Sequence, residues 1–356
     1  MRLKNLYIVL ALLVVPVSLS LAGEKVSPDD PNIQYVGRVD YTDAKAPKIT
    51  WPASEVNLKF EGVSLQVTLD DEKGKNRFNV FIDGDTEDPM LLEVEQGEKT
   101  YTLAEGLSEG THTVSLHKRS EGSNGYTIVK GFELNDGATL FTPDALPAKK
   151  LEVFGDSISC GLGADAGLKP GKDYSEHGVN ARNSYVAYSA VTARNLGCEY
   201  RCISRSGIGL VKSWWPTIMP QYYDMLNGNT DEGKGEKWDF SQWQPDYVVV
   251  NLFQNDSWII KKPDQEQMIQ AYVDFIKKLR GHYPKAKIFC TLGSMSANKT
   301  PWAGYVKQAV ARMNEGGDKQ VYAYIFATST NSMHPKRKHH KRMAAELTAF
   351  IKSKEE

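Results

Sequence analysis

The apolar positions along the chain follow two different periodicities, and the change between them divides the chain in two. From Ile33 to Leu134, short runs alternate apolar and polar residues, with almost no helical periodicity. In the run 63–69, Val or Leu stands at every second position, so one face packs and the other meets water. About eight such strands predict an antiparallel β-sandwich or jelly roll. The other clear runs are Phe78–Asp83, Tyr101–Leu103, His112–His117 and Tyr126–Leu134.

After a linker at Thr142–Lys150, which contains two prolines, apolar runs alternate with helical patterns. This βαβ order predicts a mostly parallel sheet with helices on both faces. Two long, polar, Gly-rich stretches, Gly161–Asn183 and Gln221–Trp238, are predicted to be loops, and long loops in compact domains are often functional. The expected strands are Leu151–Phe154, Glu199–Ile203, Tyr247–Leu252, Lys287–Leu292 and Val321–Phe326, and the expected helices are Tyr185–Asn195, Gln265–Leu279, Trp302–Met313 and Lys341–Lys352.

Residues 1–22 have the layout of a secretory signal peptide. Two basic residues precede the apolar run Leu6–Val17, and small residues at positions 20 and 22 follow it. A membrane anchor is the alternative, but Pro16 interrupts the run and no stop-transfer charge cluster flanks it closely. We therefore expect cleavage after Ala22, export to the periplasm or the extracellular space, and no membrane attachment afterwards. The mature chain would then hold a β-sandwich domain at 23–146 and an α/β domain at 147–356.

The composition narrows the chemistry further. The four cysteines form no Cys-x-x-Cys pair and have no histidine at ligand spacing, so a structural zinc site is not supported. We expect no cofactor. Buried free thiols are the default for these cysteines. An oxidising compartment permits a disulfide, and Cys160 with Cys202 is the candidate pair because both lie at or just after predicted strands.

The formal net charge of −1 hides an asymmetry between the two parts of the chain. Residues 23–147 carry 12 basic and 23 acidic residues, whereas residues 148–356 carry 29 and 21. Mutual attraction between the domains is the simple interpretation, and export argues against a nucleic-acid partner. The basic run 336–342 would then dock against the acidic domain; the alternative is that it lies at the rim of the site and attracts acidic glycans.

The ends of the predicted parallel strands carry the candidate chemistry, because ligands of open α/β sheets bind beyond the carboxyl ends of the strands. A serine esterase needs a hydroxyl nucleophile, an imidazole and donors for the developing oxyanion. Ser157 would attack, and His334 would act as base and then acid. The backbone N–H groups of Ser157 and Gly207 and the Asn255 amide would form the oxyanion hole.

Each of these residues also has a plainer interpretation, as a helix cap, a strand end or a turn. Their occurrence in order at four strand ends favours an enzyme. The four blocks are Gly155-Asp156-Ser157, Ser206-Gly207, Asn255-Asp256 and His334-Pro335.

In this order the four blocks resemble those of the SGNH (GDSL-like) hydrolases, which implies a flavodoxin-like fold for the second domain. Together with the preceding β domain, three further motifs make the chain similar to carbohydrate esterase family two. That resemblance implies an N-terminal jelly roll, no metal, and removal of acetyl groups from xylan, glucomannan or their oligosaccharides. The three motifs are Trp51-Pro52, His117-Lys118-Arg119 and Thr192-Ala193-Arg194.

The chain departs from the superfamily pattern around two of the blocks. Phe253 stands where a glycine normally precedes the Asn-Asp pair, and Met333 stands where many family members have Trp. The usual Asp before the histidine is missing, since Asn331 and Ser332 occupy those places. The family that the chain resembles includes members that operate with a Ser-His dyad, in which a backbone carbonyl holds the imidazole, so the missing Asp does not exclude activity. The expected supporting residues are Asp156, Asp256, Asn331 and Ser332, and the expected substrate-lining residues are Phe253, Met333, Trp214 and Trp258.

These features predict a secreted serine esterase that deacetylates plant-type polysaccharides or oligosaccharides through an acyl-enzyme, with an acetylated carbohydrate as its partner and the oligomeric state left open. One alternative is a glycan-binding protein on a degenerate hydrolase scaffold. The other is an esterase that acts on lipid or bacterial-glycan esters, although the chain lacks a Gly-x-Ser-x-Gly elbow and an amphipathic lid.

Overall fold

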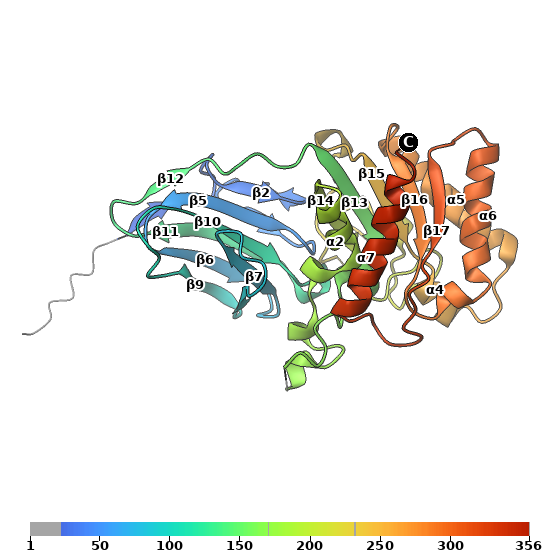
Figure 1. The fold of residues 1–356 in the computed structure, drawn as a ribbon, viewed down its shortest axis with the longest axis horizontal. Helices are drawn as coiled ribbons and strands as arrows, with labels where there is room; N and C mark the ends of the chain where they lie inside the picture. Colours follow the sequence, from blue (N-terminus) through green and yellow to red (C-terminus); the bar gives the residue numbers. More distant parts are fainter. Residues whose placement is uncertain (1–22, 170, 231–232, 356) are drawn as a thin grey trace, which may run out of the picture.

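The computed structural model describes residues 23–169, 171–230 and 233–355. The signal peptide predicted at 1–22 lies outside these residues. Figure 1 shows a β domain and an α/β domain side by side, joined by an extended segment between strands β12 and β13.

Two antiparallel sheets face each other in the β domain, and their inner faces enclose one apolar core. The described residues form twelve strands here, more than the expected eight, because strands of two to four residues show no detectable alternation. The first sheet has the order β3-β4-β11-β6-β9 with β1 on β11, and the second has β12-β5-β10-β7-β8 with β2 on β5. The strands are β1 Glu24–Val26, β2 Gln34–Val36, β3 Val39–Asp40, β4 Lys48–Ile49, β5 Glu55–Glu61, β6 Leu65–Asp71, β7 Arg77–Ile82, β8 Met90–Glu93, β9 Gly97–Ala104, β10 Thr111–Lys118, β11 Thr127–Leu134 and β12 Thr139–Phe141.

The second domain contains one parallel five-stranded sheet in the order β14-β13-β15-β16-β17, which is the flavodoxin-like order and confirms the expected fold class. Helices α2 and α7 pack on one face and α5 and α6 on the other (Figure 1). The strands are β13 Lys149–Gly155, β14 Cys198–Ser204, β15 Tyr247–Asn251, β16 Lys287–Leu292 and β17 Val321–Ile325. The helices are α1 Ser157–Cys160, α2 Tyr188–Asn195, α3 Met219–Tyr222, α4 Gln254–Ile259, α5 Gln265–His282, α6 Trp302–Glu315 and α7 Arg337–Lys352.

Charged groups are buried where the two domains meet. Arg38 of the β domain forms an ion pair with Glu152 of β13 at 3.1 Å, and both side chains are fully buried. The Arg38 guanidinium also donates to the backbone carbonyls of Tyr223 and Met225. Removing two charges from water costs several kcal/mol per ion, so such a pair is stable only when its remaining hydrogen bonds are satisfied. These carbonyls pair one terminal nitrogen of the guanidinium and Glu152 pairs the other, while the buried Nε has no partner among the described contacts.

A second buried charge at this junction is the Asp165 carboxylate, which is 2% exposed. It forms ion pairs with Arg119 of the β domain at 2.8 Å and with Arg337 at the start of α7. The basic run 336–342 was predicted to dock against the acidic domain through its charges. That prediction is wrong for Arg337, which pairs with Asp165. Among the described contacts, the ion pair of this run is with a carboxylate of its own domain. In the pairs of Glu152 and Asp165 across the junction, the more acidic domain supplies the arginine, so its net charge does not describe these contacts.

The motifs that carry the family resemblance also lie at this junction. The Trp51 indole N–H donates to the backbone carbonyl of Leu226 at 2.7 Å, and its side chain is buried. His117 forms a hydrogen bond with the Ser184 hydroxyl at 3.1 Å. Trp51 and His117 therefore contribute to the packing of the two domains.

The four cysteines are buried and free, as the default interpretation predicted, and the alternative Cys160–Cys202 disulfide is not formed. Helix α7 begins four residues before the predicted Lys341, because its first turn is basic and shows no apolar periodicity. His340 in that turn is nevertheless buried and accepts a hydrogen bond from the backbone of Tyr188. Within the described residues, none of the helices combines the length and apolarity that crossing a membrane requires.

Replacing Arg38 by Met should destabilise the protein by about 3–5 kcal/mol, because Glu152 would be left as a buried, unpaired charge. The matched control is Lys59→Met, which removes the exposed ion pair with Asp144 and should cost less than about 1 kcal/mol. Urea unfolding followed by circular dichroism measures both variants. Equal, small losses in the two variants would show that the buried pair does not stabilise the fold.

Candidate active site

The turn that joins β13 to α1 places Ser157 at the carboxyl end of the sheet. Asp156 caps α1, and its carboxylate accepts a hydrogen bond from the backbone of Ile158 at 2.9 Å. Gly161 ends the helix after one turn in the left-handed conformation, with φ +71°. The Ser157 hydroxyl is thereby fixed at the start of a short helix.

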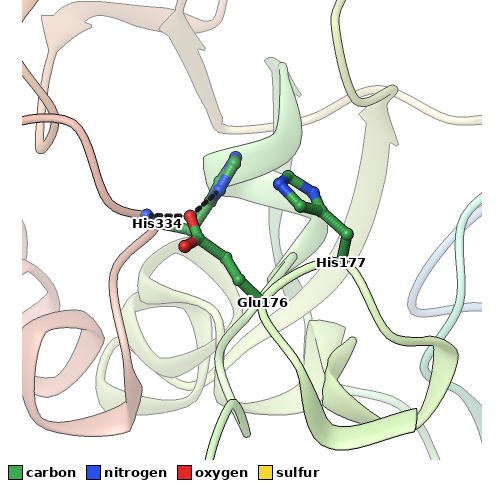
Figure 2. Close-up of side chains that lie close together, drawn as sticks. All are labelled: Glu176, His177 and His334. Carbon is green, nitrogen blue, oxygen red and sulfur yellow. Dashed lines mark hydrogen bonds and ion pairs between the residues drawn. The ribbon is translucent and has the colours of Figure 1, made fainter. Parts of the chain in front are cut away.

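Ser157, His334 and Glu176 form a hydrogen-bonded chain. The His334 Nε2 atom lies 2.9 Å from the Ser157 Oγ, and its Nδ1 atom lies 2.7 Å from a Glu176 carboxylate oxygen. The same oxygen accepts the backbone N–H of His334 at 2.9 Å, and Figure 2 shows both contacts. A carboxylate can only accept, so Nδ1 carries the proton and Nε2 is left to accept from the serine hydroxyl. This is the arrangement of a Ser-His-acid triad.

Glu176 corrects the expectation that a backbone carbonyl holds the imidazole. It comes from the long loop after α1, 158 residues before His334, and not from the segment just before the histidine. Asn331 does not take this role: it has φ +59°, and its side-chain oxygen accepts from Lys299. Ser332 is exposed, and no hydrogen bond joins it to the imidazole among the described contacts. The sequence indicated the loop as functional, but no spacing rule pointed to its glutamate.

Burial and the neighbouring carboxylate act in opposite directions on this histidine. Burial lowers the pKa of His334 below its usual value, and the hydrogen bond and negative charge of Glu176 offset part of that shift. Burial alone would raise the pKa of Glu176, but its hydrogen bonds from His334 lower it overall. Near neutral pH the pair is therefore a neutral imidazole beside a carboxylate, which is the state that a general base requires.

Two backbone N–H groups near the nucleophile are free to bind an anion. Among the described residues, no acceptor is found for the N–H of Ser157 or that of Gly207. Gly207 has φ +81°, and a Cβ there would lie 2.8 Å from the Trp215 indole nitrogen. Only glycine suits both the conformation and the space.

Asn255 lies beside these groups at the start of α4. Its amide nitrogen donates to the backbone carbonyl of Ile208 at 2.8 Å and lies 3.3 Å from the Asp156 carboxylate. Its amide oxygen accepts the indole N–H of Trp214 at 3.1 Å, which fixes the orientation of the amide. Asp256 accepts three consecutive backbone N–H groups, from Leu210 to Lys212, and so holds the loop that carries Gly207.

The β domain also reaches the site, through Glu121. This carboxylate is 1% exposed and accepts the backbone N–H of Ser206, next to Gly207. It forms an ion pair with Arg182, near the end of the loop that carries Glu176, and accepts from the Cys160 thiol at 3.5 Å. One buried side chain of the first domain thus contacts three segments of the site. Sequence analysis missed it because nothing in its local sequence marks the contact.

The expected substrate-lining residues differ in how exposed they are. Phe253 is fully buried at φ +87°, with its ring 5.0 Å from those of Tyr272 and Trp302, so its assignment to the substrate wall is wrong. Apolar packing offsets the strain of a left-handed conformation, which costs about 1–2 kcal/mol. Trp214 and Met333, by contrast, are 61% and 57% exposed. The fourth candidate, Trp258, is partly buried and donates to the Ser296 hydroxyl at 2.9 Å.

Comparison with known proteins agrees with this geometry. Residues 35–143 match the family model "Carbohydrate esterase 2 N-terminal", and residues 153–321 match that of the GDSL-like lipase/acylhydrolase family. The chain is 36% identical to the cellulase/esterase CelE of Acetivibrio thermocellus over 92% of its own length and 40% of the relative's. It is 26% identical to an acetylxylan esterase/glucomannan deacetylase of Cellvibrio japonicus, over 94% of this chain and 92% of the relative.

A solved structure extends the likeness to nearly the whole chain. It is a family two carbohydrate esterase from Clostridium thermocellum in complex with cellohexaose, with 32% identity and a TM-score of 0.81. The alignment covers 90% of this chain and 98% of that one. The chain therefore belongs to carbohydrate esterase family two, a family of carboxylic ester hydrolases.

Proposed function

We propose that this protein is a secreted serine esterase that removes O-acetyl groups from plant-type polysaccharides or oligosaccharides, such as xylan or glucomannan. The observation that carries the proposal is the hydrogen-bonded chain from Ser157 through His334 to Glu176, beside two free backbone N–H groups. The name of the relative from Cellvibrio japonicus, an acetylxylan esterase/glucomannan deacetylase, supports the substrate class. Export rests on the sequence of residues 1–22 alone.

The mechanism follows from the donor and acceptor roles of these atoms. The Ser157 Oγ attacks the acetyl carbonyl while its proton passes to Nε2 of His334. The carbonyl oxygen becomes an oxyanion, which the N–H groups of Ser157 and Gly207 bind. His334 then protonates the sugar oxygen as the C–O bond breaks, leaving an acetyl-enzyme. Water then attacks the acetyl-enzyme in the same way, with His334 again as base and then acid, and acetate is released.

Two further side chains adjust this reaction. Glu176 stabilises the imidazolium that forms in each step and holds the ring in the productive tautomer. Asn255 would donate a third hydrogen bond to the oxyanion by exchanging its long contact with Asp156 for the substrate oxygen. Because the indole of Trp214 binds the same amide, an exposed aromatic surface next to the site is available to a sugar ring.

The glycan-binding alternative loses most of its basis in this geometry. It was motivated by Phe253, Asn331 and Met333, which depart from the superfamily pattern. Phe253 is a core residue, and Glu176 supplies the carboxylate that the residues before His334 lack. Met333 alone remains as a change on the exposed surface.

Ser157→Ala should lower the release of acetate from acetylated xylan or an aryl acetate by at least about 10⁴-fold. The fold should persist, since the hydroxyl contacts only the imidazole among the described hydrogen bonds. Retention of most of the activity would exclude Ser157 as the nucleophile. Rates on aryl esters of increasing acyl length test the alternative lipid substrate, which predicts faster turnover of long chains.

Glu176→Gln should lower kcat by roughly 10²–10⁴-fold, because the imidazolium loses its counter-charge. The matched control is Ser332→Ala, which should keep the parent rate because Ser332 occupies the usual position of the acid without contacting the ring. A Glu176→Gln variant that retains nearly full activity would restore the dyad hypothesis.

The pH profile of the same variant has a predicted direction. His334 must be neutral to act as base, so kcat/KM rises with pH through the histidine pKa. Glu176 raises that pKa, and removing its charge should move the acid limb of kcat/KM to lower pH. In the parent enzyme burial already places this limb below the usual histidine pKa. An acid limb that moves upward in the variant would contradict the electrostatic role of Glu176.

Asn255→Ala should lower kcat by about 10²–10³-fold with little change in KM, because an oxyanion donor acts in the transition state and not on the bound ester. Steady-state kinetics and thermal unfolding measure the variant. If it turns over at the parent rate, or unfolds under conditions in which the parent is folded, Asn255 is a structural residue that holds Ile208 and Trp214.

A further inference from the structure

A third titratable side chain, His177, lies against the catalytic pair and has no part in the mechanism above. Its ring is packed edge-on against that of His334, with ring centroids 5.6 Å apart. Figure 2 shows the rings of His177 and His334 and the Glu176 carboxylate gathered in one place. One ligand atom from each of these residues lies within 4.8 Å of the other two.

These three residues form a donor set that suits a zinc-type cation. Two imidazole nitrogens and a carboxylate oxygen are ligands that Zn²⁺ binds in a tetrahedral site with an open fourth position. Mg²⁺ and Ca²⁺ prefer oxygen ligands alone, so the set discriminates against them. His177 is exposed, and through it a cation can enter from solvent.

The movement needed to close this set around an ion is small. Ligands at about 2.0–2.1 Å from Zn²⁺ in a tetrahedral site are about 3.4 Å apart. The present separations of up to 4.8 Å exceed that value by little more than 1 Å. Glu176 and His177 are neighbours on a segment outside any helix or strand, and the His177 side chain is exposed.

We propose that Glu176, His177 and His334 form an inhibitory binding site for Zn²⁺ or a similar transition-metal cation, which reversibly switches the esterase off. This inference rests on the proposed function, in which His334 is the base. An ion on Nδ1 binds the other tautomer of the neutral ring: solvent takes the proton from Nδ1 and returns one to Nε2, which can then no longer accept from Ser157. An ion on Nε2 occupies the base itself. In both cases Glu176 is diverted from the imidazole.

The first test is inhibition of aryl acetate hydrolysis by added ZnCl₂, with MgCl₂ as the parallel titration. The parent enzyme should lose activity with Zn²⁺ and recover it with EDTA, whereas Mg²⁺ should have no effect. His177→Gln should keep the parent rate without metal and need about 10–100-fold more Zn²⁺ for half inhibition. The matched control is His339→Gln in the first turn of α7, which should keep the parent sensitivity.

The outcome that overturns the proposal is an unchanged half-inhibitory Zn²⁺ concentration in His177→Gln, which would place the inhibiting ion elsewhere. An equal loss of sensitivity in both variants would show a general surface effect and would overturn it too.

A second readout does not depend on activity. Calorimetric titration of Ser157→Ala with Zn²⁺ should show one ion per chain, and Co²⁺ should give the intense visible absorption of a tetrahedral site. Adding His177→Gln to this variant should weaken both signals. Absence of binding to Ser157→Ala would refute the site. Binding by an enzyme that proves to have no esterase activity would instead keep the site and refute the proposed function.

Discussion

The active site depends on charged side chains that are buried where the two domains meet. Glu121, Arg119 and Asp165 are almost completely buried, and each forms an ion pair with a residue of the other domain. Breaking such a pair leaves an uncompensated charge in a medium of low dielectric constant. The relative position of the domains is therefore fixed by ion pairs whose geometry tolerates little displacement. Because Glu121 also binds the backbone of Ser206, this constraint extends to the oxyanion loop.

The opposite formal charges of the two domains play little part in that arrangement. Ion pairs of both orientations cross the junction. Arg38 and Arg119 of the acidic β domain pair with carboxylates of the basic α/β domain, whereas Glu121 of the β domain pairs with an arginine of the α/β domain. The net charge of each domain comes mainly from surface residues, where solvent and salt screen the attraction between the domains. At the buried junction, ion pairs with about 3 Å between their atoms are shielded from water, and they determine how the domains pack.

The sequence was sufficient to predict the elements whose position follows from a local pattern of residues. Alternation and βαβ order predicted the architecture of both domains, and Ser157, Gly207, Asn255 and His334 all lie where the strand ends of a parallel sheet converge. Glu176 was not predictable in this way, because its position depends on the path of a long irregular loop and on no periodicity. Glu121 depends in addition on how two domains dock.

The expectation for Phe253 failed for a different reason. It followed the family motif, whereas burial in the core determines where this side chain lies. The family pattern has glycine there, and the bulky residue was expected to face the substrate. The ring instead packs between Tyr272 and Trp302 in the core beneath α5 and α6. Residue 253 has a left-handed backbone conformation, which favours glycine, while its side chain is buried in the core. A motif thus fixes backbone conformation more reliably than side-chain role.

The buried contacts of Glu121 also bear on how such a protein can evolve. A gene rearrangement that separated the β domain from the hydrolase would remove the partner of Arg182, one partner of Asp165 and the acceptor of the Ser206 N–H together. The fragment left behind would carry unpaired charges on a newly exposed face beside its own nucleophile. These contacts therefore favour recombination that moves the two domains together as one unit.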